Sequence, residues 1–188
     1  MKGLIACVLL LSALLAHAAA EVAGIRFADT ATVAGKTLVL NGAGLRKKLF
    51  FKVYAVGLYL PAKAGGAAEA IAETGPKRLD LTLLRDLSAQ TFVDAFVEGL
   101  SHNLSPDELR ALDPQIEQFT QSILALEKAP EGARFQIDYA PASGTQLSVN
   151  GNLAGAAIPG PELYNAILRV WLGEMPAQED LKAGLLGR

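Results

Sequence analysis

The chain has 188 residues, of which 51% are hydrophobic and 19% are charged, and its formal net charge is −2. That length and composition fit one folded domain and exclude a disordered chain, and the absence of a basic excess argues against nucleic-acid binding. One Cys and two His are too few for a zinc site or a disulfide framework, so the sequence predicts neither a metal nor another cofactor.

The first twenty residues have the layout of a secretory signal peptide. Lys2 supplies the positive charge, an apolar run covers residues 4–15, and small residues continue to Ala20. Cleavage after Ala18 and cleavage after Ala20 both fit. The apolar run is shorter than the roughly 20 residues that a spanning helix needs, so we expect no stable membrane span after signal removal. We therefore expect export, to the periplasm in a Gram-negative source, and one domain over residues 21–188.

The strongest β signal lies in residues 36–60. Runs rich in β-branched and aromatic residues at 37–40 and 49–60 flank the Gly-rich segment 41–44, which predicts a turn between two strands. Both faces of the second run are largely apolar, so we expect this strand to be covered on both sides. A short helix over 64–74 and a strand over 77–85 are expected to follow.

Two capped helices are predicted next. Ser88 precedes a run with apolar residues at helical spacing, and Ser105 to Glu108 form a capping box with Pro106 at the first helical position. Asp113-Pro114 predicts a break or kink in the second helix, with Asp113 as a new cap.

The remainder of the chain predicts a hairpin and two further helices. Strands are expected over 135–139 and 146–149, a second hairpin turn at 150–151, and helices over 159–172 and around 181–186. Strands, then helices, then a hairpin and helices is the order of an α+β domain, because alternating βαβ units are missing.

Few residues outside the expected core can carry chemistry. One interpretation of the basic run Arg46, Lys47 and Lys48 is a solvated tip between strands. In the other interpretation, Arg46 turns inward and its guanidinium binds an anion. Tyr54 has the same strand parity as Arg46, so the two side chains can share a face. His102 is explained by its position at a helix C-terminus, without a catalytic role.

Several segments resemble the chalcone isomerase family, and within it the exported bacterial members. The similarity extends over most of residues 30–187, and the segments that carry it are 41–46, 51–60, 84–88, 148–151 and 171–187. The resemblance implies an open-faced β-sandwich, in which helices are layered on one face of a large antiparallel sheet with a ligand cleft between them.

The resemblance also assigns site residues. In the family's enzymes an Arg after the Gly-x-Gly segment positions the substrate, and a strand Thr and a helix Tyr polarise its ketone. Arg46 keeps the first position, while Tyr54 replaces the Thr. Phe92, Gly99 and Val170 fall on the positions of the helix Tyr, an Asn and a late Ser or Thr. Arg46 would therefore be catalytic only if this chain were an enzyme, and the loss of the polarising groups disfavours catalysis.

The Arg–Tyr pair is similar to that of the family's fatty-acid-binding members. Our leading hypothesis is a non-catalytic exported protein that holds a small amphipathic carboxylate, such as a fatty acid, between Arg46 and Tyr54, with Phe50, Phe92 and Phe96 as cleft walls. One alternative is a chalcone isomerase-like intramolecular lyase or isomerase that takes an enone ligand. A second alternative is a scaffold or interaction protein with a vestigial cleft.

Overall fold

The structure, a computed structural model, describes residues 20–126 and 128–188, so nearly all of the predicted signal segment lies outside it. The strands are β1 (Ala20–Val22), β2 (Ile25–Phe27), β3 (Thr30–Val33), β4 (Lys36–Lys48), β5 (Phe51–Leu60), β6 (Lys77–Leu83), β7 (Leu87–Ser88), β8 (Lys128–Ala129), β9 (Arg134–Ala140), β10 (Gly144–Val149) and β11 (Asn152–Ile158). The helices are α1 (Ala67–Ala72), α2 (Ala89–Asn103), α3 (Pro106–Leu124), α4 (Glu162–Leu172) and α5 (Glu179–Leu185). No helix of this part of the chain is both long and apolar enough to cross a bilayer.

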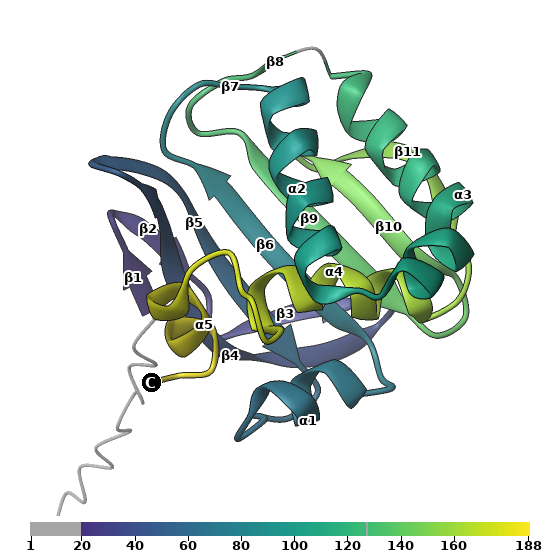
Figure 1. Cartoon of the computed structure of the whole chain (residues 1–188). Helices are drawn as coiled ribbons and strands as arrows, with labels where there is room; N and C mark the ends of the chain where they lie inside the picture. The colour runs from purple at the N-terminus through teal and green to yellow at the C-terminus, as the bar shows by residue number, and fades with distance from the viewer. Residues whose placement is uncertain (1–19, 127) are drawn as a thin grey trace, which may run out of the picture.

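One large antiparallel sheet organises the fold. Its seven strands follow the order β11-β10-β9-β6-β5-β4-β3, and α2, α3 and α4 lie over one face (Figure 1). The prediction of an α+β, open-faced sandwich with helices on one face of an antiparallel sheet is therefore confirmed. Two short pairs, β1 with β2 and β7 with β8, complete the pairing.

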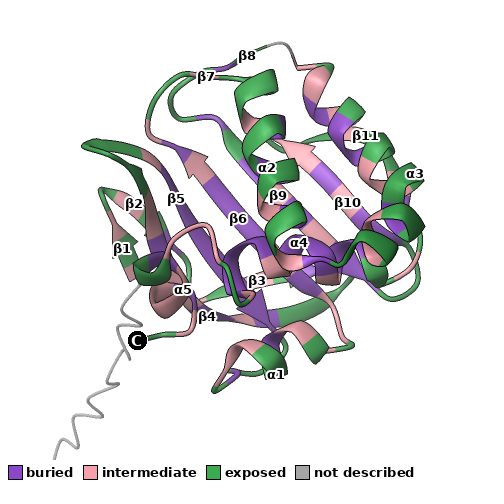
Figure 2. Cartoon of the chain, viewed as in Figure 1, coloured by how far each residue is buried: buried purple, intermediate pink, exposed green. Residues whose placement is uncertain are grey.

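The core lies between the sheet and these helices, and the central strands are its most buried part (Figure 2). Along β5 every residue from Tyr54 to Leu60 is buried. Alternate side chains such as Val56 and Leu58 belong to the main core, whereas Tyr59 packs with Phe27 in a smaller cluster on the opposite face. The expectation that this strand is covered on both faces is confirmed.

The turn predicted at residues 41–44 is wrong. β4 continues through this segment with a bulge between Leu40 and Gly42, and the chain reverses only after Lys48. Gly42 and Gly44 instead allow helix α5 to pack closely on β4. A Cβ on Gly42 would lie 2.2 Å from the Gly184 carbonyl oxygen, and one on Gly44 would lie 2.6 Å from a Leu181 methyl. Glycine here lets α5 lie directly on β4.

The helix caps agree with the sequence. The Ser88 hydroxyl accepts a hydrogen bond from the backbone N–H of Thr91 at 3.1 Å, and Ser105 and Glu108 form the predicted capping box. Of the predicted break or kink at Asp113-Pro114, the break with Asp113 as a new cap is wrong, because α3 runs continuously from Pro106 to Leu124. Pro114 is exposed, and the packing of the apolar face of α3 holds the helix together across the missing N–H.

The later elements also follow the predictions. Strands β9 and β10 pair in antiparallel register, and Asn150 and Gly151 connect β10 to β11 with φ angles of 51° and 82°. These positive values are those of the tight hairpin turns that Asn-Gly favours. The last two predicted helices correspond to α4 and α5, and α4 is almost wholly buried.

Candidate functional site

A cleft of about 900 Å³ opens between the free end of the β4–β5 hairpin, helix α2 and the segment from α4 to α5. All five residues predicted to bind ligand line it, namely Arg46, Tyr54, Phe92, Gly99 and Val170. The cleft volume lies within the range of small-molecule sites, roughly 300–1,000 Å³. The fold thus brings together residues from β4, β5, α2 and α4.

Tyr54 lies in the wall of the cleft and is 8% exposed. Its hydroxyl oxygen accepts a hydrogen bond from Nε1 of Trp171 at 2.9 Å. Within residues 20–126 and 128–188, no oxygen or nitrogen accepts the hydroxyl's own proton. Burial raises the pKa of Tyr54 from 10.0 to about 12, against smaller lowering effects of Trp171 and Arg46. The phenol therefore stays protonated and can donate to a ligand.

Arg46 is the cross-strand partner of Tyr54 in the β4–β5 register. Its guanidinium donates to the carbonyl oxygen of Lys47 at 3.1 Å and weakly to Oε1 of Gln178 at 3.4 Å. Both acceptors are uncharged, and no carboxylate of the described chain forms a salt bridge with Arg46. The half-buried positive charge is thus available to an anion beside the Tyr54 hydroxyl.

Two residues that hold this pair in place were not predicted. Gln178 bonds β4 on both sides of Arg46: its Oε1 accepts from the N–H of Lys47 at 2.9 Å, and its Nε2 donates to the carbonyl of Leu45 at 3.3 Å. Trp171 orients the Tyr54 hydroxyl. Trp171 and Gln178 lie 117 and 132 residues from their partners, so no local spacing could reveal them. The only available signal was that Trp171 is the single tryptophan of the chain.

Aromatic side chains of α2 form the apolar wall. Phe92 stacks on Phe135 with ring centroids 5.6 Å apart, and Phe96 packs against Phe119 at 5.3 Å. These contacts fix the positions of the two predicted wall residues on α2, which both line the cleft. The prediction of Phe50 as a third wall residue is wrong, because this side chain is 94% exposed and lies outside the cleft.

Gly99 and Val170 contribute shape rather than polarity. A Cβ on Gly99 would lie 2.7 Å from Cγ1 of Val170, so the glycine permits α2 and α4 to approach closely. Neither side chain offers a hydrogen bond to a ligand. Arg46 and Tyr54 therefore provide polar groups on the strand side of the cleft, and Gly99 and Val170 add apolar surface at the contact between α2 and α4.

The mouth of the cleft carries charges of both signs. Among its acidic residues, Asp86 accepts from the N–H of Glu131 at 2.8 Å and Asp94 accepts from Gln90 at 2.7 Å. His102 is exposed near the end of α2, in the position that its helix-terminal interpretation requires. In the described residues no three His, Cys, Asp or Glu side chains come together as a metal-binding group.

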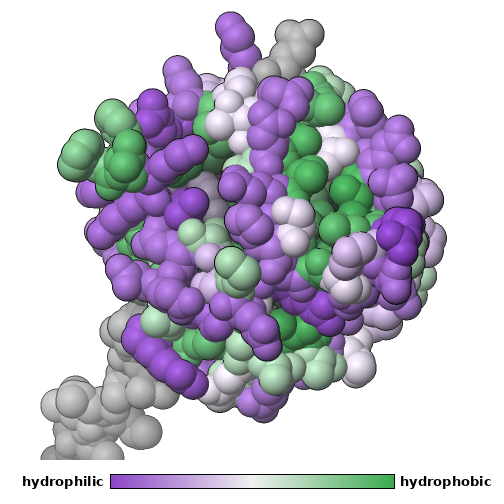
Figure 3. Space-filling model, viewed as in Figure 1, coloured by the Kyte–Doolittle hydropathy of each residue, from purple (hydrophilic) through white to green (hydrophobic). Residues whose placement is uncertain are grey.

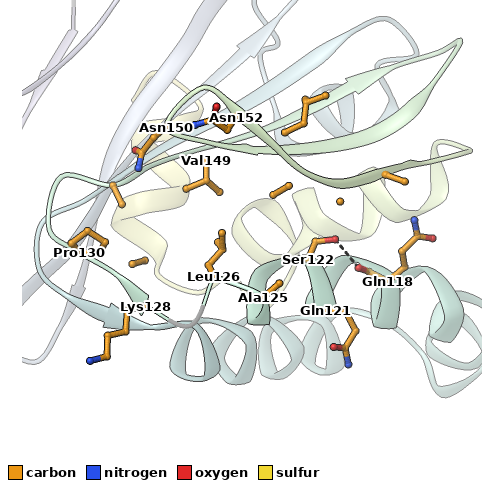
Figure 4. Close-up of a pocket in the computed structure, with 16 residues that line it drawn as sticks. Gln118, Gln121, Ser122, Ala125, Leu126, Lys128, Pro130, Val149, Asn150 and Asn152 are labelled. Atoms are coloured by element: carbon orange, nitrogen blue, oxygen red, sulfur yellow. Dashed lines mark hydrogen bonds between the residues drawn. The ribbon is translucent and has the colours of Figure 1, made fainter.

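A second cavity, of about 670 Å³, lies between the end of α3 and the β10–β11 hairpin (Figure 4). Its lining is mostly small apolar residues with uncharged polar ones, and the Ser122 hydroxyl is already bonded to the carbonyl of Gln118 at 3.0 Å. Lys128 supplies the one charged side chain of this lining, and Figure 4 shows it pointing away from the cavity. This cavity therefore offers no partner for a carboxylate.

Comparison with known proteins agrees with this architecture. The family model described as chalcone isomerase-like matches residues 19–187. A crystal structure of a fatty-acid binding protein from Arabidopsis thaliana is similar, with a TM-score of 0.63, 20% sequence identity, and coverage of 87% of this chain and 92% of that chain. At this identity the similarity establishes a shared fold. No curated protein sequence matches the chain. The chain belongs to the chalcone isomerase-like family.

Proposed function

We propose that the protein binds a fatty acid, or another small amphipathic carboxylate, in the cleft headed by Arg46 and Tyr54, and that it does so without catalysing a reaction. One observation carries the proposal: the buried Tyr54 hydroxyl has a proton that no described residue accepts, and it lies beside the unpaired charge of Arg46. Following the pattern of residues 1–20, we further propose that the protein is exported.

The chemistry of the two groups suits a carboxylate. A carboxylate leaving water needs a countercharge and hydrogen bonds, and the Arg46 guanidinium with the Tyr54 hydroxyl supplies both. With a pKa of about 12, the Tyr54 hydroxyl stays protonated at neutral pH and well into the alkaline range, so it donates to the ligand rather than repelling it. An acyl chain would then lie along the apolar surface that includes Phe92 and Val170.

The comparison with the Arabidopsis thaliana protein supports the ligand class, because that protein is a fatty-acid binding protein with the same fold. The second cavity has no charged side chain directed into it, so the geometry favours the Arg46–Tyr54 cleft as the carboxylate site.

Affinity measurements on matched variants test the proposal. A fluorescent fatty acid is titrated against wild type, Arg46→Ala and Tyr54→Phe, and native mass spectrometry checks for co-purified ligand. Loss of the hydroxyl should weaken binding about tenfold or more, and loss of the half-buried Arg46 charge about thirtyfold.

Two control variants separate the site from general effects. Tyr59→Phe removes another buried hydroxyl from β5, on the opposite face of the strand, and Arg26→Ala removes an exposed cation paired with Glu21. Both should bind like wild type. No measurable ligand in wild type, or equal affinity in wild type and Arg46→Ala, would contradict the proposal.

The enone alternative rests on the same hydroxyl, since a buried donor can polarise a ketone as well as bind a carboxylate. A chalcone absorbance assay distinguishes the two, because turnover that disappears in Arg46→Ala would establish an enzyme. In the scaffold alternative, Arg46→Ala changes neither ligand binding nor turnover, and a protein partner co-purifies with both forms.

A further inference from the structure

The end of the β4–β5 hairpin is apolar where hairpin ends are normally polar. Leu49, Phe50 and Phe51 are 83%, 94% and 55% exposed, and they are consecutive. In Figure 3 an apolar cluster stands out from a largely hydrophilic surface at the end of this hairpin. Elsewhere in the described chain the large exposed apolar side chains, Leu153 among them, are isolated in sequence. Exposed apolar groups that gather at one place mark an interaction site.

The turn itself is unfavourable for these residues. Lys48 pairs with Phe51, so Leu49 and Phe50 form a two-residue loop, and Leu49 has φ +56°. Gly, Asn or Asp normally occupies such a position, because a branched side chain at positive φ is strained. No core contact compensates for this strain, since both side chains are exposed. An outlier of this kind at an exposed tip indicates function.

Positive charge surrounds the apolar tip. Lys47, Lys48 and Lys52 are exposed on either side of it, and the Arg85 guanidinium lies 4.7 Å from the centre of the Phe51 ring. Residues 30–68 contain no Asp or Glu, although the whole chain has a net charge of −2. The tip is therefore a local concentration of cations with aromatic groups at its apex.

We propose that this tip, residues 47–52 with Arg85, docks on an anionic phospholipid bilayer. A projecting apolar apex can enter the interface between headgroups and acyl chains while the lysines around it contact lipid phosphates. Pairing two tips of this chain would bring like charges together, which disfavours a second copy as the occupant.

The tip also adjoins the cleft. Lys48, Leu49, Phe51 and Arg85 contribute to the cleft lining together with Arg46 and Tyr54. A protein docked in this way would present the mouth of the cleft to the bilayer. A fatty acid could then pass between the bilayer and the cleft without crossing bulk water. This transfer role rests on the proposed function, whereas the membrane contact itself does not.

Vesicle binding of ligand-free protein tests the contact. Co-sedimentation is measured with vesicles of phosphatidylcholine alone and with added phosphatidylglycerol, at low and high salt. We expect binding to the anionic vesicles, weakening with salt as the charges are screened. Phe50→Ser should weaken binding about tenfold, and the triple change of Lys47, Lys48 and Lys52 to Ala about a hundredfold, at about fivefold for each lysine.

Matched controls make the test specific to the tip. Leu153→Ser removes an exposed apolar side chain from β11 and should bind vesicles like wild type. All variants are made in the identical chain, so any contribution of residues 1–19 is common to them. As a second readout, Trp at position 50 (Phe50→Trp) should give blue-shifted emission with anionic vesicles, whereas Leu153→Trp should not.

The outcomes separate this proposal from the preceding one. Phe50 lies outside the cleft, so Phe50→Ser should keep wild-type affinity for fatty acid in solution. Equal vesicle binding by wild type and Phe50→Ser, or none by wild type, overturns the membrane contact even if fatty acid binds. If wild type forms a dimer and Phe50→Ser dissociates it, the membrane contact is overturned and the tip is a self-association surface. Vesicle binding without fatty-acid binding leaves the contact standing and removes the transfer role.

Discussion

At the scale of single residues, the site depends on a tyrosine that is kept neutral. Tyr54 accepts one hydrogen bond from Trp171 and keeps its own proton for a ligand, and burial raises its pKa to about 12. Arg46 opposes this shift, with a smaller effect than the burial or the Trp171 hydrogen bond. In the proposed carboxylate site the two roles are separate, because Arg46 would carry the charge that attracts the ligand and Tyr54 would add a donor without adding charge.

This pKa gives the ligand affinity a defined pH dependence. An ordinary tyrosine would be half ionised at pH 10.0, whereas Tyr54 with a pKa of about 12 remains a donor there. We expect the ratio of affinities between wild type and Tyr54→Phe to stay constant from about pH 7 to pH 10, as measured by fatty-acid displacement. Convergence of the two affinities as pH 10 is approached would show that the hydroxyl ionises normally, and equal affinities at every pH would show that it does not contact the ligand.

At the scale of elements, the close contact of α5 with β4 positions the cleft. Gln178 immediately precedes α5 and bonds β4 on both sides of Arg46. The helix can lie this close because Gly42 and Gly44 have no side chain to separate the two backbones. The element that holds the site together is thus the last helix of the chain.

Gly42→Ala tests this contact. Its Cβ would meet three backbone atoms, at 2.2 Å from the Gly184 oxygen and 2.7 Å from two others, so α5 must shift. We expect the free energy of unfolding to fall by about 1–3 kcal/mol in urea titrations, with weaker fatty-acid binding as Gln178 moves. In the matched Gly65→Ala, the added Cβ meets only a Glu69 oxygen at 3.6 Å, an ordinary contact. A stability change no larger for Gly42→Ala than for Gly65→Ala would refute the role of this packing.

At the scale of the whole molecule, Lys77 ties several layers together from a buried position. Its ammonium donates to the carbonyls of Glu73 at 2.6 Å and Ile71 at 3.3 Å, and to Oδ1 of Asn165 on α4 at 3.0 Å. It also lies 5.3 Å from the ring centre of Tyr139 and 5.4 Å from that of Tyr164. This one side chain from β6 thereby joins the sheet, α4 and the end of α1.

Lys77 should make global stability rise with pH in the mildly alkaline range. Burial lowers its pKa from 10.5 to about 8, so between these values the unfolded chain binds a proton that the folded chain does not. The free energy of unfolding should therefore increase by on the order of 1–2 kcal/mol between about pH 7.5 and pH 9.5. Between about pH 10 and pH 12, Tyr54 and Tyr59 lower the free energy of unfolding. They ionise in the unfolded chain near pH 10.0 but in the folded chain only near pH 12.

The rise in the free energy of unfolding with pH should disappear in Lys77→Met. It should persist in Lys63→Met, which changes an exposed lysine. Urea denaturation of the three proteins across the pH range measures the difference. An equal pH slope in wild type and Lys77→Met would show that the ammonium titrates at its ordinary value in the folded protein.

Much of the fold and part of the site follow from local sequence patterns. The caps at Ser88 and Ser105 were predictable because a capping hydroxyl bonds to an N–H within the next three residues. Strand parity predicted that Arg46 and Tyr54 can share a face, but their cross-strand pairing depends on the reversal at residues 49–50, which was predicted at residues 41–44. The family resemblance added Phe92, Gly99 and Val170 to the cleft-lining residues, although a ligand contact for each of them stays a prediction.

Contacts between distant segments decided the rest. Asn-Gly at residues 41–42 has the local signature of a turn, and only the approach of α5 explains why a strand passes through glycines there. For the same reason Phe50 was misplaced: once the reversal moves to residues 49–50, it lies on an exposed tip instead of in a wall. The sequence by itself determined the class of fold and the starts of the two capped helices, because hydrophobic period and capping act over a few residues. The reversal at residues 49–50 placed Arg46 opposite Tyr54. The tertiary structure alone decided that Trp171 and Gln178 complete the site, because their bonds span more than a hundred residues.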